Sequence, residues 1–192
     1  MNRLGHVALV PFGLAAHVEH PAAMRYSRDF ARSRRVNGSL GMGPDGKGKI
    51  NRLWAAESTL SHTGAMADHR LSIRSEHGLP FVMALGAALG VGTQPASELR
   101  NEKRVQQFIN VLAEELQQNR GRAVLVAGRR QSPEVHALVA QINQALDAPG
   151  KTLDYIADPD PDRAAHLASI TGLQRDITAN KVTALFIIGG NP

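Results

Sequence analysis

Apolar residues in the second half of the chain recur every three or four positions, which is the period of an amphipathic helix. The pattern predicts a helix between Ser97 and Gly121, with Ser97 as its N-cap and Gly121 just after its end. The apolar positions of this helix are Val105, Phe108, Ile109, Leu112 and Leu116. The unbroken apolar run that follows, Ala123 to Ala127, is typical of a strand covered on both faces.

A second helix and a second strand follow at short intervals. Ser132 in capping position and Pro133 in the first turn predict a helix that ends before Pro149. Its apolar positions are Val135, Leu138, Val139, Ile142 and Leu146. Residues 151–157, KTLDYIA, predict a short strand, and the acidic, proline-broken run 158–162 predicts a loop.

The last part of the chain predicts one more helix and one more strand. Helical spacing joins Leu167, Ile170, Leu173 and Ile177, and Asn180 suits the left-handed position that ends a helix. Residues 182–188, VTALFII, form the most apolar predicted strand. Strands alternating with helices over short connections predict an α/β fold with a Rossmann-like, doubly wound parallel sheet. Because a buried strand needs cover on both faces, we expect the chain to be a fragment of a longer protein.

The first half of the chain is less regular. In order, the pattern predicts a helix, a glycine-rich loop, a strand and a helix, in residues 21–36, 41–49, 50–56 and 76–90. We therefore divide the chain into an N-terminal helix and glycine-rich linker segment, residues 1–46, and an α/β domain, residues 47–192, truncated at its C-terminus.

Composition narrows the classes of function. The net charge of +5 invites a nucleic-acid partner, but aromatic residues at 4% argue against a surface that stacks bases. The densest basic stretch, residues 25–35, has five arginines that we expect to spread around a helix. A solvated or partner-facing surface is the favoured interpretation of this stretch, and a phosphate-binding role is the alternative. The absence of cysteine excludes disulfides and cysteine-bound iron–sulfur clusters within these residues. The longest later apolar run, FVMALGAALGVG, is too short to span a bilayer.

The segment from Ser58 to Arg74, STLSHTGAMADHRLSIR, holds the densest set of chemically active side chains. It follows a predicted strand, and ligands of open α/β sheets bind at the carboxyl ends of strands. Asp68, His69 and Arg70 are therefore candidates for a polar site, although neither metal-ligand spacing nor a nucleophile elbow is present. The structural alternative, which we favour, is that Asp68 caps a turn and pairs with Arg70 while His69 bonds to the backbone.

Two glycine-rich stretches are candidates for binding phosphate. Gly189 and Gly190 directly follow the predicted strand 182–188, and Asn191 offers both a donor and an acceptor there. Such a loop either holds a nucleotide or serves only to turn the chain. The stretch GMGPDGKGK, residues 41–49, lacks the spacing of a phosphate-binding loop, and we interpret it as a linker.

Three longer segments carry a resemblance to a known family. They are NRLWAAESTLSHTGAMADHRLSIR, AVLVAGRRQSPEVHALVAQINQALDAPGKTLDYI and NKVTALFIIGGNP, with MRYSRDFARSRR before the first. They resemble the molybdopterin-oxidoreductase-like part of the large iron–sulfur subunit of alternative complex III, a quinol:electron-acceptor oxidoreductase. The resemblance covers residues 22–192, and the first twenty residues fit it poorly.

The resemblance implies a respiratory membrane complex on the periplasmic face of the cell envelope. Its other subunits, multihaem cytochrome c and integral membrane quinol-binding subunits, are the implied partners, with no nucleic acid among them. Iron–sulfur clusters are expected in a missing C-terminal part, and an export signal upstream. No catalytic or metal-binding residue is expected in this fragment. Gly189, Gly190 and Asn191 match a nucleotide-contacting loop of cofactor-bearing relatives, but this subunit is thought to have lost the cofactor.

Two alternatives stay open at this point. In the first, the chain is part of a true molybdopterin guanine dinucleotide oxidoreductase, in which Gly189, Gly190 and Asn191 hold the nucleotide. In the second, it is a free-standing basic α/β module that binds nucleotide or nucleic acid. Sequence upstream and downstream of the segment would distinguish the true molybdopterin enzyme from the subunit of alternative complex III.

Overall fold

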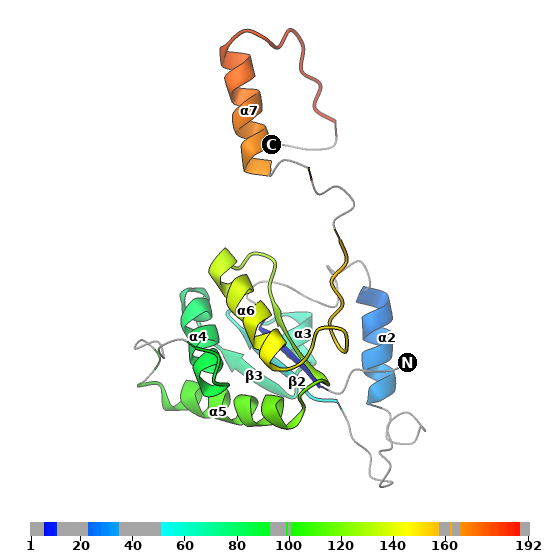
Figure 1. The fold of residues 1–192 in the computed structure, drawn as a ribbon, viewed down its shortest axis with the longest axis vertical. Coiled ribbons are helices and arrows are strands. Elements are labelled where there is room, and N and C mark those ends of the chain that lie inside the picture. Colours follow the sequence, from blue (N-terminus) through cyan, green and yellow to red (C-terminus); the bar gives the residue numbers. More distant parts are fainter. Residues whose placement is uncertain are drawn as a thin grey trace. The chain divides into compact units, whose positions relative to one another are not determined.

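The parallel sheet of this protein draws its strands from widely separated parts of the chain. The computed structural model describes residues 6–10, 23–34, 51–92, 99, 101–157, 162 and 166–188. Its four strands are β1 (His6–Val10), β2 (Leu53–Glu57), β3 (His69–Ser72) and β4 (Ala123–Ala127). They lie in the order β3-β2-β1-β4, and every neighbouring pair is parallel. The predicted α/β class with a parallel sheet is confirmed (Figure 1).

The strand β1 lies inside the sheet, although the sequence pattern assigned no strand there. Val7 is in register with Leu53 of β2 on one side and with Val124 of β4 on the other. The strand is only five residues long, begins with the polar His6 and is followed by Pro11, so its pattern is weak by itself. The chain forms two compact units, residues 1–154 and 155–192, which differ from the division at residue 46 drawn from the sequence.

One face of the sheet carries the main hydrophobic core. Three helices pack on this face, and α4 (Gly78–Ala88) lies against both α5 (Lys103–Gln118) and α6 (Pro133–Ala145) (Figure 1). A short 3₁₀ helix, Ser75–His77, leads into α4. The side chains of Trp54, Ala56 and Leu71 point into this core. The predicted apolar positions of α5 and α6 are buried except Phe108, which is half-buried.

The opposite face carries two helices. They are α2 (Ala23–Ser33) and the single turn α3 (His62–Ala65). Phe30 of α2 packs with Leu53 and Ala67 in a second, smaller core. Neighbouring residues of a strand point to opposite faces, so Leu53 packs in the smaller core and Trp54 in the main core. Through these two residues, the helices on both faces of the sheet pack against the same strand, β2.

Several element boundaries follow the sequence signals closely. β4 spans the predicted residues, and α6 begins at Pro133, as predicted, and ends at Ala145, before Pro149. After α5 the chain turns through Gly121, whose φ of +71° lies in the left-handed region that glycine adopts without strain. Asn180, just after α7 (His166–Thr178), has a φ of 54°, as predicted. Ser97 and the stretch 41–49 lie outside the described residues.

The predicted strand at residues 151–157 is wrong, and the outer edge of β4 gives the reason. Both the N–H and the C=O of Leu125 are bonded to the side-chain amide of Asn143, at 2.8 and 2.7 Å. The carbonyl of Ala123 accepts a hydrogen bond from Thr152 Oγ1 at 2.9 Å. The backbone groups that a further strand needs on this edge are therefore already paired, and residues 154–157 are irregular and exposed.

The predicted strand at residues 182–188 is also wrong. In the second unit the structure describes one regular element, α7, and residues 184–188 form no ladder. A strand needs a partner for its backbone groups, and the described part of this unit contains none. The apolar side chains from Leu185 to Ile188 are all exposed.

Candidate functional site

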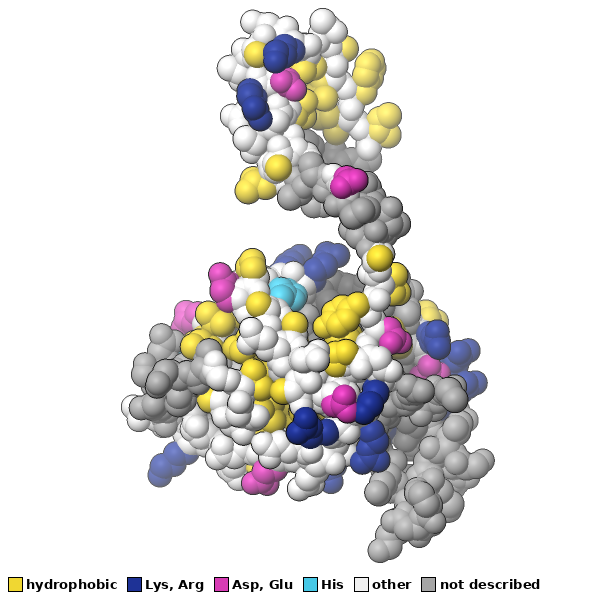
Figure 2. All heavy atoms as spheres, viewed as in Figure 1, with side chains coloured by type: hydrophobic (Ala, Val, Ile, Leu, Met, Phe, Trp, Pro, Cys, Tyr) yellow, Lys and Arg dark blue, Asp and Glu magenta, His cyan; other side chains and the backbone are white. Residues whose placement is uncertain are grey.

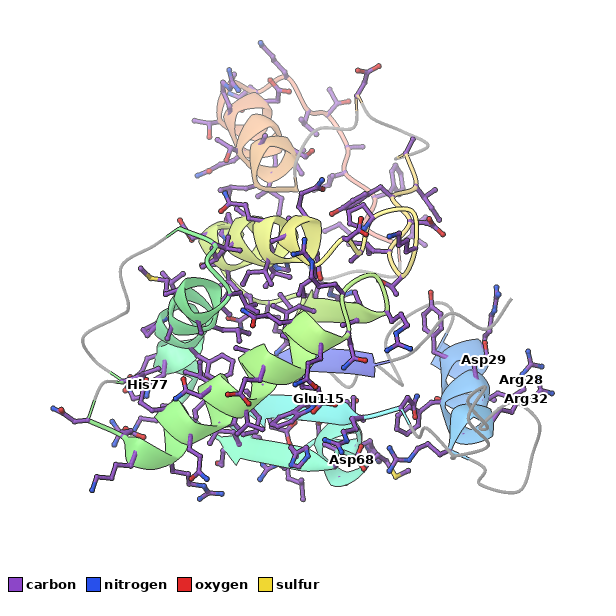
Figure 3. The ribbon with its side chains drawn as sticks, turned by 60° about the horizontal axis from the view of Figure 1, so that its bottom comes forward. Arg28, Asp29, Arg32, Asp68, His77 and Glu115 are labelled. Carbon is purple, nitrogen blue, oxygen red and sulfur yellow. The ribbon has the colours of Figure 1, made fainter. Side chains whose placement is uncertain are left out.

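The segment from Ser58 to Arg74 folds as a short helix and a strand, not as an open loop. It contains α3, then β3, and it places Asp68, His69 and Arg70 against three different partners. Each partner defines the role of its side chain, and Figure 3 shows where Asp68 and Glu115 lie.

A carboxylate buried at the carboxyl end of β2 forms the first cluster. Glu57 is the last residue of β2 and is 1% exposed. Its Oε1 accepts a hydrogen bond from Arg70 Nε at 2.5 Å, and its Oε2 accepts one from Ser61 Oγ at 2.6 Å. The N–H of Ser61 also donates to Oε1, at 3.3 Å. Every bond to this carboxylate therefore ties β2 to β3 or to the start of α3.

Glycine is required beside this carboxylate. Ser61 is the N-cap of α3, and its Oγ accepts a hydrogen bond from the N–H of Gly64 at 3.0 Å. A Cβ built on Gly64 would lie 1.8 Å from Glu57 Oε1, far inside contact distance. The absence of a side chain at Gly64 thus allows α3 to approach the buried carboxylate.

A second carboxylate lies at the amino end of the same two strands. Asp68 accepts two hydrogen bonds from the guanidinium of Arg34, at 2.8 and 2.6 Å, and a third from the N–H of Leu53 at 2.8 Å. The bonds from Arg34, helped by the bond from Leu53, hold the pKa of Asp68 below its usual value, against the opposing effect of partial burial. The pKa of Arg34 is raised by the same pair. Arg34 also donates to the carbonyl of Asn51 at 2.9 Å, which fixes the end of α2 to the sheet.

An aromatic stack accounts for His69. Its ring lies 3.9 Å from that of Trp54, nearly parallel to it, and the histidine is exposed on its other side. Trp54 Nε1 donates to Glu115 Oε2 at 3.1 Å, and Arg52 Nη1 donates to the same oxygen at 3.2 Å. The contacts of His69 therefore couple β3 to β2 and, through Glu115, to α5.

These contacts correct the expected pairing. Asp68 was expected to pair with Arg70 and His69 to bond to the backbone, but Asp68 pairs with Arg34, Arg70 pairs with Glu57, and His69 stacks on Trp54. Asp68 also lies at the amino end of the strands, not at the carboxyl end. In a parallel sheet, residues 69 and 70 point to opposite faces, so the three neighbours in sequence cannot share one site.

The crevice at the carboxyl ends of β2 and β3 is lined by other residues. It has a volume of about 870 Å³ and presents the hydroxyls of Ser58, Ser72 and Ser75 together with Arg74, Glu76 and His77. Glu76 lies 3.2 Å from Arg74 and 3.8 Å from His77. The crevice lies where open α/β sheets bind ligands. However, its charged side chains pair with one another at an exposed rim.

The other predicted site and the searches for metals give little more. Gly189, Gly190 and Asn191 lie outside the described residues. Among the residues that the structure describes, no three His, Asp or Glu side chains are close enough together to hold a metal ion. Within the same residues, no helix has both the length and the apolarity to cross a bilayer.

Sequence reasoning missed Glu57 and Arg34, the two partners that matter most. Glu57 had a signal, because a single acid at the end of an otherwise apolar strand must find a partner if it is buried. Arg34 had none, since it was one of five arginines in a basic stretch and its partner lies 34 positions away. Neither the models of known protein families nor the curated proteins match this chain.

Proposed function

We propose that this chain is part of a molybdopterin-oxidoreductase-like domain with a Rossmann-like, doubly wound fold. The domain belongs to the large iron–sulfur subunit of a quinol:electron-acceptor oxidoreductase, alternative complex III, at the periplasmic face of the cell envelope. Its role is structural: it provides a rigid support and docking surfaces for subunits that transfer electrons. The proposal combines the resemblance of residues 22–192 with three features of the described structure.

The strand order supports the finer fold assignment. From β1 the chain runs outward to β2 and then β3 on one side, and it returns to place β4 on the other side of β1. This reversal beside the first strand is the arrangement of doubly wound sheets. Helices on both faces of the sheet agree with it.

The contacts of the most distinctive segment support a structural role. Glu57, Asp68 and their arginines form bonds that hold β2, β3, α2 and α3 together. Buried or half-buried ion pairs of this kind position elements and fix one arrangement of the chain. The segment that identifies the family is thus, in this interpretation, the segment that fastens the fold.

The observation that carries the docking role is the exposed apolar surface of residues 155–188, the apolar segment. Nine of the large hydrophobic side chains that the structure describes there are exposed to solvent, and yellow side chains are visible on this part of the chain in Figure 2. They are Tyr155, Ile156, Leu167, Ile170, Ile177, Leu185, Phe186, Ile187 and Ile188. Contiguous exposed apolar surface marks an interaction site in soluble proteins. A neighbouring subunit, or a further part of the same subunit, is the proposed cover.

Two measurements test this function. In the intact protein, we expect no stoichiometric molybdenum or tungsten and no guanine dinucleotide; finding them would favour the true molybdopterin enzyme instead. In the assembled complex, Phe186→Ser with Ile188→Ser should reduce copurification with the haem and membrane subunits. The matched control replaces Leu60 and Met66, which are exposed apolar residues of the first unit, by serine. Equal retention of both variants in the complex would reject the docking role of the apolar segment.

A further inference from the structure

The helix α2 presents a row of arginines that makes no bond to the described strands of the sheet. Arg25, Arg28 and Arg32 are spaced by three and four residues, so they share one face of the helix over roughly 10 Å of its length. Three of the four arginines that the structure describes in residues 25–35 are thus aligned, although the four together spread around the helix as expected. Arg34 differs from them, since it points to the opposite face and bonds to Asp68.

The positive charge of the row of arginines is only partly neutralised by neighbouring acids that the structure describes. Asp29 is the one acid of α2, and it lies 3.8 Å from Arg25 and 3.9 Å from Arg28. These distances are long for hydrogen bonds, and the side chains of Arg25 and Arg28 are 74% and 60% exposed. Arg32 is exposed and has no ion pair with any residue that the structure describes. Three cations and one acid leave a net charge of two on this face.

The other face of α2 holds the helix in place. Phe30 is 8% exposed and packs with Leu53 and Ala67, and the Arg34–Asp68 pair fixes the end of the helix to the sheet. Figure 3 shows Arg28, Asp29 and Arg32 on the side of α2 that faces away from the sheet. In Figure 2 the Lys and Arg side chains gather over this helix at the right of the larger unit. The row is therefore displayed on a fixed support.

We propose that this face of α2 binds the anionic head groups of a phospholipid surface. Guanidinium groups bind phosphate in a bidentate manner, and a straight row on one helix face can contact a flat surface at all three positions. Met24 precedes Arg28 by one helical turn, flanks the row and is 87% exposed. Arginines near an anionic membrane surface are attracted to it, and Met24 adds one apolar side chain that can enter the interface between head groups and acyl chains.

The membrane setting of this inference rests on the proposed function, but the binding itself is independent of it. The loss of vesicle binding on substitution of the α2 arginines measures this inference, whereas copurification with subunits and cofactor analysis measure the proposed function. Either can fail while the other holds.

The test uses vesicles that contain phosphatidylglycerol, with pure phosphatidylcholine vesicles as reference. A triple variant, Arg25→Gln, Arg28→Gln and Arg32→Gln, should bind the anionic vesicles roughly 100-fold more weakly, at about fivefold for each arginine. The matched control removes the same charge elsewhere, by Arg120→Gln, Arg129→Gln and Arg130→Gln, all at exposed positions. It should lose less than about fivefold. Equal losses in both triple variants would overturn the proposal, as would binding to duplex DNA without binding to vesicles.

A second readout does not depend on the stability of the triple variant. Because the chain has no cysteine, Met24→Cys introduces a single thiol for an environment-sensitive fluorophore. We expect its emission to shift to the blue with anionic vesicles and to stay unchanged with neutral ones. The same label at Met66→Cys, another exposed methionine, should not respond. A label at Met24→Cys that never responds to anionic vesicles would contradict the lipid contact.

Discussion

Two arginine–carboxylate pairs fasten the same two strands, and they differ mainly in burial. The side chain of Glu57 is 1% exposed at the carboxyl end of β2, whereas that of Asp68 is 27% exposed at the amino end of β3. The Glu57–Arg70 pair joins β2 to β3, and the Asp68–Arg34 pair joins the sheet to the end of α2. Water can solvate Asp68 when its partner is lost, but it cannot reach Glu57. The two pairs should therefore respond differently to the same kind of substitution.

The largest expected effect comes from removing the partner of the buried carboxylate. Arg70→Met keeps the length of the side chain but leaves the charge of Glu57 opposed only by the hydrogen bonds of Ser61. We expect the free energy of unfolding to fall by about 3–5 kcal/mol, measured by urea denaturation.

A double variant isolates the cause. Glu57→Gln combined with Arg70→Met removes both charges and should be more stable than Arg70→Met alone, because no uncompensated charge is left buried. If the double variant is the less stable of the two, burial of an unpaired charge does not explain the loss.

A smaller effect is expected from crowding the same carboxylate. The Cβ of Gly64→Ala would lie 1.8 Å from Glu57 Oε1, so either α3 or the carboxylate must move. We expect a loss of about 1–3 kcal/mol in the free energy of unfolding, as for other overpacked sites. Gly92→Ala is the control, since a Cβ there meets no atom within 4 Å. Similar losses at both glycines would indicate a backbone effect and not contact with Glu57.

The parts of the fold that were predictable from the sequence are those specified locally. The periodic apolar positions of α6, with Ser132 and Pro133 at its start, set both its bounds and its buried face. Residues 182–188 are as apolar as β4 but form no strand, because β4 has β1 as a partner and they have none among the described residues. Pairing partners are distant in sequence, and the apolar pattern does not identify them.

The same reasoning explains why the site was only half predicted. The residues of the segment from Ser58 to Arg74 identify it as a polar segment. Their spacing also shows that it has no complete set of metal ligands and no complete nucleophile arrangement. The partners were not predictable, since Asp68 bonds to an arginine 34 positions away and Glu57 to one 13 positions away. Alternation along β3 then separates His69 and Arg70 onto opposite faces of the sheet.

The half-exposed pair should give a smaller loss than either change beside Glu57. Asp68→Asn preserves the shape of the side chain and an acceptor for the N–H of Leu53, but it removes the charge that Arg34 binds. We expect a loss of about 1 kcal/mol in urea denaturation near neutral pH. A loss as large as that of Arg70→Met would break the comparison, because burial would then not set the cost.

The smallest expected effect is the pH dependence of the difference in unfolding free energy between the wild-type protein and Asp68→Asn. Since Arg34 lowers the pKa of Asp68 in the folded protein, protons bind this carboxylate more readily in the unfolded chain. The stability that Asp68 contributes is therefore fully present above its unfolded pKa of about 3.9 and is lost as the pH falls through the lower, folded pKa. The difference in unfolding free energy between the wild-type protein and Asp68→Asn should stay constant from neutral pH to about pH 5 and shrink below pH 4. Urea denaturation of both proteins across this range measures it, and other carboxylates cancel because both proteins share them. A difference that stays constant down to the lowest pH would show that the Arg34–Asp68 pair does not lower the pKa of Asp68. The contrast in burial between Glu57 and Asp68 would then not explain how the two carboxylates contribute to stability.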